Sequence, residues 1–155
     1  MRNNEFLSYI EDLLRDGELI DRISNYPSHR LSDHAKKTNG GRLDHCLRVA
    51  YMSYKLAEIL KLNKRKCSRA GLLHDCGYGT NESAGIQFLR HSFYGSEIAR
   101  KQKEWDVARI IESHMFPVGA APNSVEAIVL WVVDKVDAIL DFFHITLSPA
   151  CLNLY

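Results

Sequence analysis

The feature of this sequence that most constrains its fold is an apolar run that ends in two metal-binding types of side chain. Residues 70–73 (Ala-Gly-Leu-Leu) are followed directly by His74 and Asp75. A helix that ends here brings an imidazole and a carboxylate out of a packed core at one place, and divalent metal ions take both as ligands. Gly77 and Gly79 come next and predict a turn. The alternative is a helix C-terminus with one polar pair, where a histidine suits the helix dipole.

Apolar residues recur at helical spacing through most of the chain, and no segment alternates with period two for long enough to predict a strand. We therefore expect an all-α fold. The polar residues 27–41 predict a long loop, and Asn63 predicts an N-cap. Because residues 127–133 are apolar on every side, the last helix is expected to be buried at the centre. Helices are expected over residues 6–14, 19–26, 42–62, 63–75, 82–89, from 91 onward, 106–113 and from 122 to about 143.

Length and charge narrow the classes of protein that this sequence allows. The 155 residues are 46% hydrophobic and 25% charged, fractions typical of one globular domain, so we expect a single domain over residues 1–155. The net charge of +1 favours neither a nucleic acid nor a membrane surface as partner. No apolar stretch is long enough to span a bilayer, and the first residues do not lead into a signal-peptide core. The four cysteines form no CxxC pair, which indicates reduced thiols and a cytoplasmic location.

Three further histidines and one aspartate lie on or beside apolar helical stripes. His45, His91 and His114 each align with apolar residues at helical spacing, and Asp134 interrupts the apolar residues 128–133. A buried carboxylate must be paired, protonated or bound to metal. Any one of these residues alone is more often a hydrogen-bonded core residue than a ligand. A shared metal centre, however, would supply the charge that all of the buried ligands lack.

The order of these residues along the chain resembles the signature of the HD-domain superfamily of metal-dependent phosphohydrolases. The resemblance runs over about residues 42–143 and includes the segments AGLLHD, HSxxGS, IESHMFP and VDK. It implies a mostly helical bundle with a metal site between helices. It also implies that one divalent metal is bound by His45, His74, Asp75 and Asp134. Two segments resemble members with six ligands for two metals, which places His91 and His114 on a second metal and makes Asp75 the bridge.

The sequence departs from the family pattern at one position shortly after His74 and Asp75. Many members carry a lysine there that helps to neutralise phosphate, and this chain has Tyr78. Arg42, one turn before the first proposed histidine ligand, and Lys135, beside Asp134, are the nearest candidates for that role, and both could equally be surface charges. Asp137 shares the helix face of Asp134 and could orient a ligand.

The resemblance implies hydrolysis of a phosphomonoester or phosphoanhydride in a nucleotide or another phosphorylated small molecule. Metal ions lower the pKa of a bound water to about 7 in the best-known zinc case and so supply a nucleophile. Asp75, Arg42 and Lys135 are the expected catalytic residues. Mixed imidazole and carboxylate ligands favour iron or manganese, and zinc, cobalt or magnesium stay open. The alternatives are a di-iron oxygenase and a non-catalytic nucleotide-binding domain, and a homodimer through the N-terminal helices is left open. Solvated, structural roles are expected for the remaining histidines, His29, His34 and His144, and a place in the cleft that holds the metal site is left open for His34.

Overall fold

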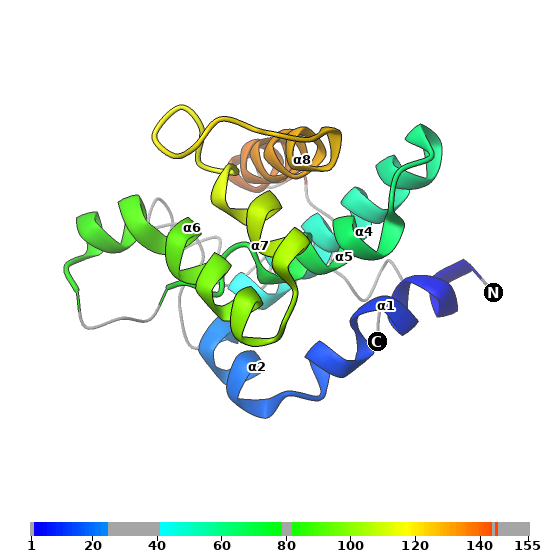
Figure 1. The fold of residues 1–155 in the computed structure, drawn as a ribbon, viewed down its shortest axis with the longest axis horizontal. Coiled ribbons are helices and arrows are strands. Elements are labelled where there is room, and N and C mark those ends of the chain that lie inside the picture. The colour runs from blue at the N-terminus through cyan, green and yellow to red at the C-terminus, as the bar shows by residue number, and fades with distance from the viewer. Residues whose placement is uncertain (1, 25–40, 79–81, 144, 146–155) are drawn as a thin grey trace.

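The computed structural model describes residues 2–24, 41–78, 82–143 and 145 (Figure 1). These residues form helices and no strand, so the prediction of an all-α fold is confirmed. The expected loop over residues 27–41, and His29, His34 and His144, lie almost entirely outside the described residues. The helices are α1 (Arg2–Leu14), α2 (Gly17–Ser24), α4 (Arg42–Leu60), α5 (Lys64–Leu73), α6 (Ala84–Lys101), α7 (Trp105–Glu112) and α8 (Val125–Phe142).

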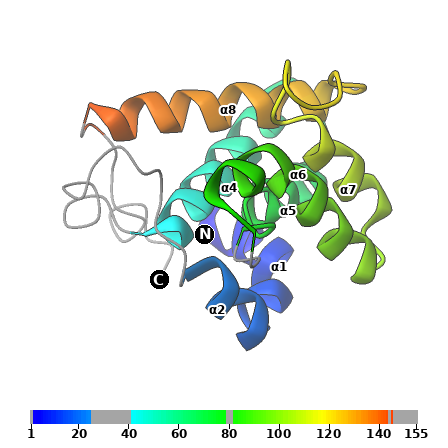
Figure 2. The ribbon, with the colours of Figure 1, turned by 90° about the vertical axis from the view of Figure 1, so that its left-hand side faces the viewer.

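The centre of the fold is the pair of helices α4 and α5. In Figures 1 and 2, α8 lies on one side of this pair, and α1 and α2 lie on the opposite side. α4 packs against α5 and α8, while α5 also contacts α1 and α7. The approach of α4 to α5 is close because Gly71 has no side chain: a Cβ atom there would lie 2.5 Å from Ala50 Cα. This contact brings the C-terminal end of α5 against α4.

The helix boundaries follow local signals in the sequence. The side chain of Asn63 accepts a hydrogen bond from the Lys66 backbone N–H at 3.0 Å, so the predicted N-cap of α5 is confirmed. Ser124 caps α8 in the same way through Ala127 N–H at 3.1 Å. α4 ends at Leu60, because Lys61 takes the left-handed conformation with φ 57°. α5 ends at Leu73, directly before the His-Asp doublet, as its sequence predicts.

Two expectations about the helices are wrong. The region from 82 onward was expected to form two helices with a break before His91, but α6 runs unbroken through that residue. The polar side chain of His91 is accommodated within the helix, because its Nδ1 atom donates to Phe88 O at 2.8 Å. The second concerns α8, which is not a central helix. One face packs on α4, α5 and α7, and the other leaves Ile128 and Ile139 exposed at 48% and 57%.

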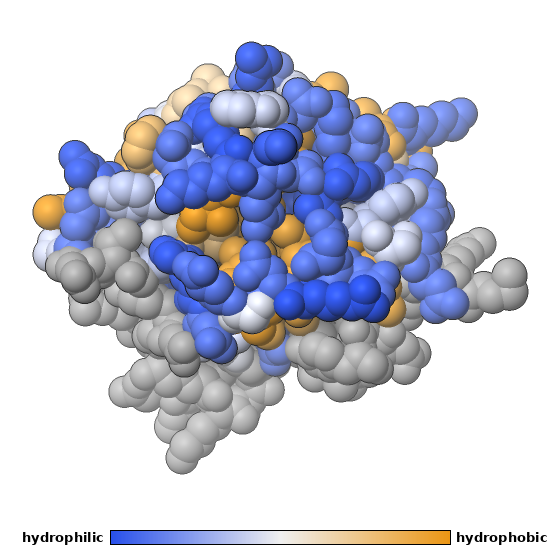
Figure 3. All heavy atoms as spheres, turned by 60° about the horizontal axis from the view of Figure 1, so that its bottom comes forward, coloured by the Kyte–Doolittle hydropathy of each residue, from blue (hydrophilic) through white to orange (hydrophobic). Residues whose placement is uncertain are grey.

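The surface differs between the two sides of the fold. Where the α1 and α2 side is turned forward, most atoms belong to hydrophilic residues, and apolar residues show in small spots between them (Figure 3). Along α8 and the end of α4, by contrast, large apolar side chains are exposed, among them Ile59, Val132 and Val136. Within the described part of the chain, no helix has the length and apolar character needed to cross a membrane.

Candidate metal centre

The fold brings together all of the residues that the sequence marks as candidate metal ligands. They come from five places in the chain: the first turns of α4, the turn after α5, the middle of α6, the turn after α7, and the middle of α8. Each is at most 5% exposed. We call them the six site residues: His45, His74, Asp75, His91, His114 and Asp134.

One group within the site consists of His45, His74 and Asp134. The Nε2 atoms of the two histidines lie 3.3 Å apart. Asp134 Oδ1 lies 3.3 Å from His45 Nε2 and 3.4 Å from His74 Nε2. The three ligand atoms therefore face one point, and they could hold one metal ion.

A second group forms around Asp75 and shares His74 with the first. Asp75 Oδ1 lies 3.6 Å from His74 Nε2, 3.4 Å from His91 Nε2 and 3.9 Å from His114 Nε2. The ligand atoms of His74, Asp75 and His114 could hold a second ion. His91 lies beside this group, with its Nε2 only 2.9 Å from His114 Nε2.

The hydrogen bonds of the imidazole rings fix which nitrogen faces the site. The Nδ1 atoms of His74, His91 and His114 lie 2.8, 2.8 and 2.7 Å from backbone carbonyl oxygens one turn earlier. A carbonyl oxygen can only accept, so each Nδ1 carries the hydrogen, and Nε2 is the ring nitrogen that can turn a lone pair towards a metal. Lone pairs that face one another at these distances are stabilised by a cation between them. The donor set therefore fits a divalent metal.

His45 is oriented by a different partner, a buried carboxylate. Its Nδ1 lies 2.7 Å from Asp137 Oδ2. Arg48 holds that carboxylate from the other side, through Nε to Oδ1 at 2.9 Å and Nη2 to Oδ2 at 3.0 Å. Arg48 Nη2 also donates to Asp141 Oδ1 at 3.1 Å. This network turns His45 Nε2 towards the site, which is the kind of support that metal-binding histidines commonly have.

The surroundings of the site shift the pKa values of its histidines in opposite directions. Burial lowers the pKa of His45, but hydrogen bonds to Asp134 and Asp137 outweigh it and raise that pKa to about 10. Burial, with His74 and His91 nearby, lowers the pKa of His114 to about 3. The pKa of His91 is also lowered, mainly by burial. In the absence of metal, one part of the site thus attracts a proton and the other repels it.

The carboxylates of the site have low pKa values even though burial alone would raise them. His74 and Arg42 outweigh burial at Asp75 and hold its pKa well below the usual range. Hydrogen bonds to His45 and His74 do the same for Asp134. Both groups are therefore anionic at neutral pH, which is the state that a metal ligand needs.

The structure also places the residues that were expected to contact phosphate. Arg42 is buried, and its Nη1 donates to Asp75 Oδ2 at 2.7 Å. Lys135 lies at the edge of the site, where its Nζ donates to Asp134 Oδ2 at 2.6 Å, and 40% of its side chain is exposed. Arg42 is therefore a buried cation beside Asp75 and not a surface charge, whereas Lys135 binds Asp134 from the partly exposed edge of the site.

Reasoning from the sequence missed two parts of this site. The role of Arg48 was not recognised, although it lies three residues after His45 and so one helical turn away. The contacts of Tyr78 were not recognised either: its ring stacks on that of His91, with centroids 4.3 Å apart. Spacing on α4 could have revealed Arg48, but no local signal could have revealed the Tyr78 contact, because it joins two separate segments.

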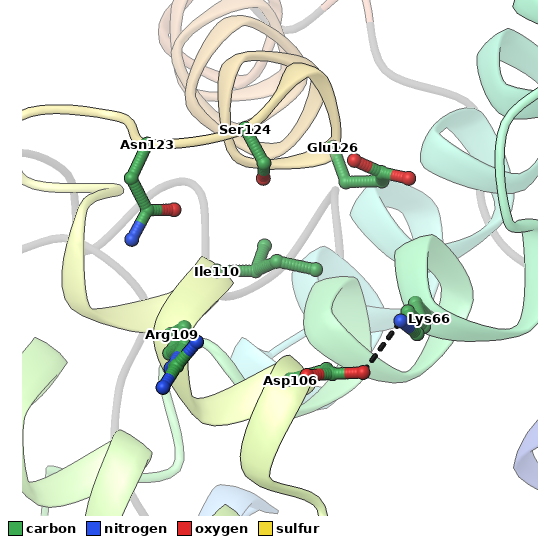
Figure 4. Close-up of a pocket in the computed structure, with 7 residues that line it drawn as sticks. All are labelled: Lys66, Asp106, Arg109, Ile110, Asn123, Ser124 and Glu126. Carbon is green, nitrogen blue, oxygen red and sulfur yellow. Dashed lines mark ion pairs between the residues drawn. The ribbon is translucent and has the colours of Figure 1, made fainter.

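A polar pocket elsewhere on the molecule contains none of the six site residues (Figure 4). It lies between α5, α7 and the start of α8. Lys66 and Asp106 form an ion pair across it, and Arg109 and Glu126 add one more charge of each sign. This balance of charges selects no particular ligand class, so we assign the pocket no role.

Comparison with known proteins agrees with the geometry of the site. The family model described as "HD domain" matches residues 42–139. Ribonuclease Y of Mesoplasma florum is 36% identical over 96 residues, which is 61% of this chain and 18% of that protein. No solved structure matches the chain. Because the family match covers more than half of the chain and includes all six site residues, we conclude that the chain belongs to the HD-domain superfamily of metal-dependent phosphohydrolases.

Proposed function

We propose that this protein is a hydrolase that uses two divalent metal ions to cleave a phosphomonoester or phosphoanhydride in a nucleotide or another phosphorylated small molecule. The proposed ligands are His45, His74 and Asp134 for one ion, and His91 and His114 for the other, with Asp75 between them. Iron or manganese suits this mixture of imidazole and carboxylate. When bound, the ions would supply a water molecule of lowered pKa as the nucleophile.

The observation that carries this proposal is the contact between His91 and His114. Their Nε2 atoms are 2.9 Å apart, while both Nδ1 atoms point to carbonyl oxygens. Both rings also have lowered pKa values, so neither Nε2 readily takes up a proton. A purely structural core would gain nothing from two buried lone pairs facing each other, whereas a metal ion would stabilise both.

The remaining charged residues suit the handling of phosphate. Asp75 Oδ2 accepts from Arg42 and Oδ1 faces the histidines, so the arginine holds this carboxylate in one orientation. Lys135 is half-exposed at the edge of the site. We infer that it contacts a substrate phosphoryl oxygen, and that Arg42 supplies positive charge beside Asp75. Such fixed charges favour the transition state for phosphoryl transfer.

Other substrates and reactions are testable alternatives. The name of the relative, Ribonuclease Y, indicates that a related domain occurs in a protein that acts on RNA, so a phosphodiester belongs in the substrate panel. The same ligand types could serve a di-iron oxygenase, whose activity would require oxygen. A nucleotide-binding domain without catalysis would bind nucleotides but turn nothing over. A cytoplasmic location goes with the proposal, because Cys46, Cys67 and Cys76 are buried free thiols.

The first experiment measures the metal content of the purified protein by plasma mass spectrometry. The variants are His74→Ala and His114→Ala, with His144→Ala as a matched control because the sequence places it after the last helix. Since His74 faces both groups, we expect His74→Ala to lose all metal, and His114→Ala to lose one ion. His144→Ala should resemble the wild type.

The second experiment measures turnover on nucleotides, other phosphate monoesters and a short RNA, in air and without oxygen. Hydrolysis in both atmospheres that disappears in His74→Ala supports the proposal. Turnover that requires oxygen would replace it with the oxygenase. A wild-type protein that binds no metal after reconstitution with iron or manganese would refute it.

A further inference from the structure

Tyr78 lies against two residues of the candidate site that are far apart in the sequence. Its ring is nearly parallel to that of His91, at an interplanar angle of 21° and with centroids 4.3 Å apart. The guanidinium carbon of Arg42 lies over the same ring, 3.9 Å from its centroid. The Arg42 guanidinium and the His91 imidazole would collide if both lay at these distances on one face of the Tyr78 ring, so they occupy opposite faces. The three side chains therefore form the Arg42–Tyr78–His91 stack.

The stack is buried and is held in place by the backbone. Tyr78 is only 7% exposed. It follows Gly77, where a Cβ atom would lie 1.9 Å from His91 O and 2.5 Å from Gly95 N. The turn after the doublet thus lies directly on α6, which no side chain at position 77 would allow. This contact sets Tyr78 beside His91 before any ligand is present.

Both outer members of the stack contact Asp75. Arg42 Nη1 donates to Asp75 Oδ2 at 2.7 Å, and His91 Nε2 lies 3.4 Å from Asp75 Oδ1. Tyr78 therefore lies between the two groups that meet the oxygens of this carboxylate. A buried guanidinium over a tyrosine ring also gains a cation–π attraction, which is stronger where water is excluded.

We propose that Tyr78 is a positioning residue: its ring holds the Arg42 guanidinium beside Asp75 and fixes the plane of the His91 imidazole. This inference rests on the proposed function for its metal-binding consequence, but the positioning itself concerns the metal-free protein. The phenyl ring carries the stacking, while the hydroxyl oxygen also accepts a hydrogen bond from Arg42, and Tyr78→Phe tests that contact separately.

The test compares Tyr78→Phe, which keeps the ring, with Tyr78→Leu and Tyr78→Met, which remove it. The matched control is Tyr54→Leu, because Tyr54 is also a buried tyrosine but packs on Phe6 and Tyr51, away from the site. Circular dichroism establishes which variants fold. Two ring-deleting variants are used so that the experiment stays decisive if one of them does not fold.

The first readout needs no metal. The ¹⁵N–¹H nuclear Overhauser effect reports the motion of the Nε–H groups of Arg42 and Arg48, and Arg48 serves as the internal reference because Asp137 holds its Nε at 2.9 Å. We expect Arg42 to be rigid in the wild type, Tyr78→Phe and Tyr54→Leu, and mobile in the ring-deleting variants. Arg48 should stay rigid in all of them. An Arg42 that stays rigid without the ring would overturn the inference.

The second readout is the affinity for Mn²⁺ alone, measured by titration calorimetry. Loss of support for a ligand typically costs roughly tenfold or more in metal affinity, so we expect at least that for the weaker site in Tyr78→Leu. Tyr78→Phe should bind as the wild type does. Equal losses in Tyr78→Phe and Tyr78→Leu would assign the effect to the hydroxyl and overturn the stack. A wild type that binds no Mn²⁺ would refute the proposed function, while the motion of Arg42 still decides the positioning role.

Discussion

The network behind His45 makes a graded prediction about metal affinity. Asp137 accepts from His45 Nδ1 at 2.7 Å and from two nitrogens of Arg48. In Asp137→Asn the amide oxygen can still accept from His45, but the NH₂ group then faces the Arg48 Nε–H, donor against donor. The negative charge that makes the imidazole a better ligand is also lost. Asp137→Ala removes the acceptor altogether.

We expect Asp137→Asn to bind Mn²⁺ roughly tenfold more weakly and Asp137→Ala roughly a hundredfold, the range observed for such supporting residues. These factors correspond to about 1.4 and about 2.8 kcal/mol of binding free energy. The loss should fall on the site that contains His45, and the group around His114 should keep its affinity.

The assay is calorimetric titration of the metal-free protein with Mn²⁺, and Asp141→Asn is the matched control. Asp141 lies one turn beyond Asp137 and accepts from Arg48 at 3.1 Å, so it belongs to the same network without supplying the partner of His45. The control should lower the melting temperature and leave the affinity close to that of the wild type. Wild-type affinity in Asp137→Ala, or an equal loss in Asp141→Asn, would refute the reasoning.

Three further predictions concern stability and protons. Glu5 has a pKa lowered to about 2, chiefly by its hydrogen bond from a lysine, so its contribution is present above its ordinary value of 4.5 and is lost as the pH falls towards 2. We therefore expect the free energy of unfolding, measured by urea denaturation, to fall less in Glu5→Gln than in the wild type as the pH is lowered through that window. Plots of this free energy against pH that run parallel for the two proteins would contradict the prediction. Gly77→Ala places a Cβ 1.9 Å from His91 O and should cost at least roughly 1–3 kcal/mol, whereas Gly17→Ala meets nothing within 4 Å and should not destabilise. Equal melting temperatures would exclude the close approach. His45, with its pKa raised to about 10, is protonated at pH 8 in the metal-free protein. Mn²⁺ binding at that pH should release about one proton, as calorimetry in two buffers of different ionisation enthalpy can measure. The same raised pKa stabilises the metal-free protein fully below about pH 6.5, and this contribution is lost as the pH rises through 10.

Much of the helical framework could be predicted because its signals are local. The caps at Asn63 and Ser124 and the end of α5 at the His-Asp doublet all follow from neighbouring residues. The break expected before His91 is wrong because this histidine is accommodated within α6. Its ring satisfies its own hydrogen bond one turn back, which periodicity does not report.

The sequence by itself determined the fold class, and helical periodicity placed His45, His74, His91 and His114 on or beside core-facing stripes. Only the tertiary structure decided their partners. It assigned Asp137 to orient His45, placed Arg42 on Asp75, and put α8 at the edge of the fold with one face exposed. The physical reason is that an apolar stripe shows only which side of its own helix faces the core. What that direction meets depends on how closely and at what angle the neighbouring helices pack. Here that packing depends on the close contacts at Gly71 and Gly77.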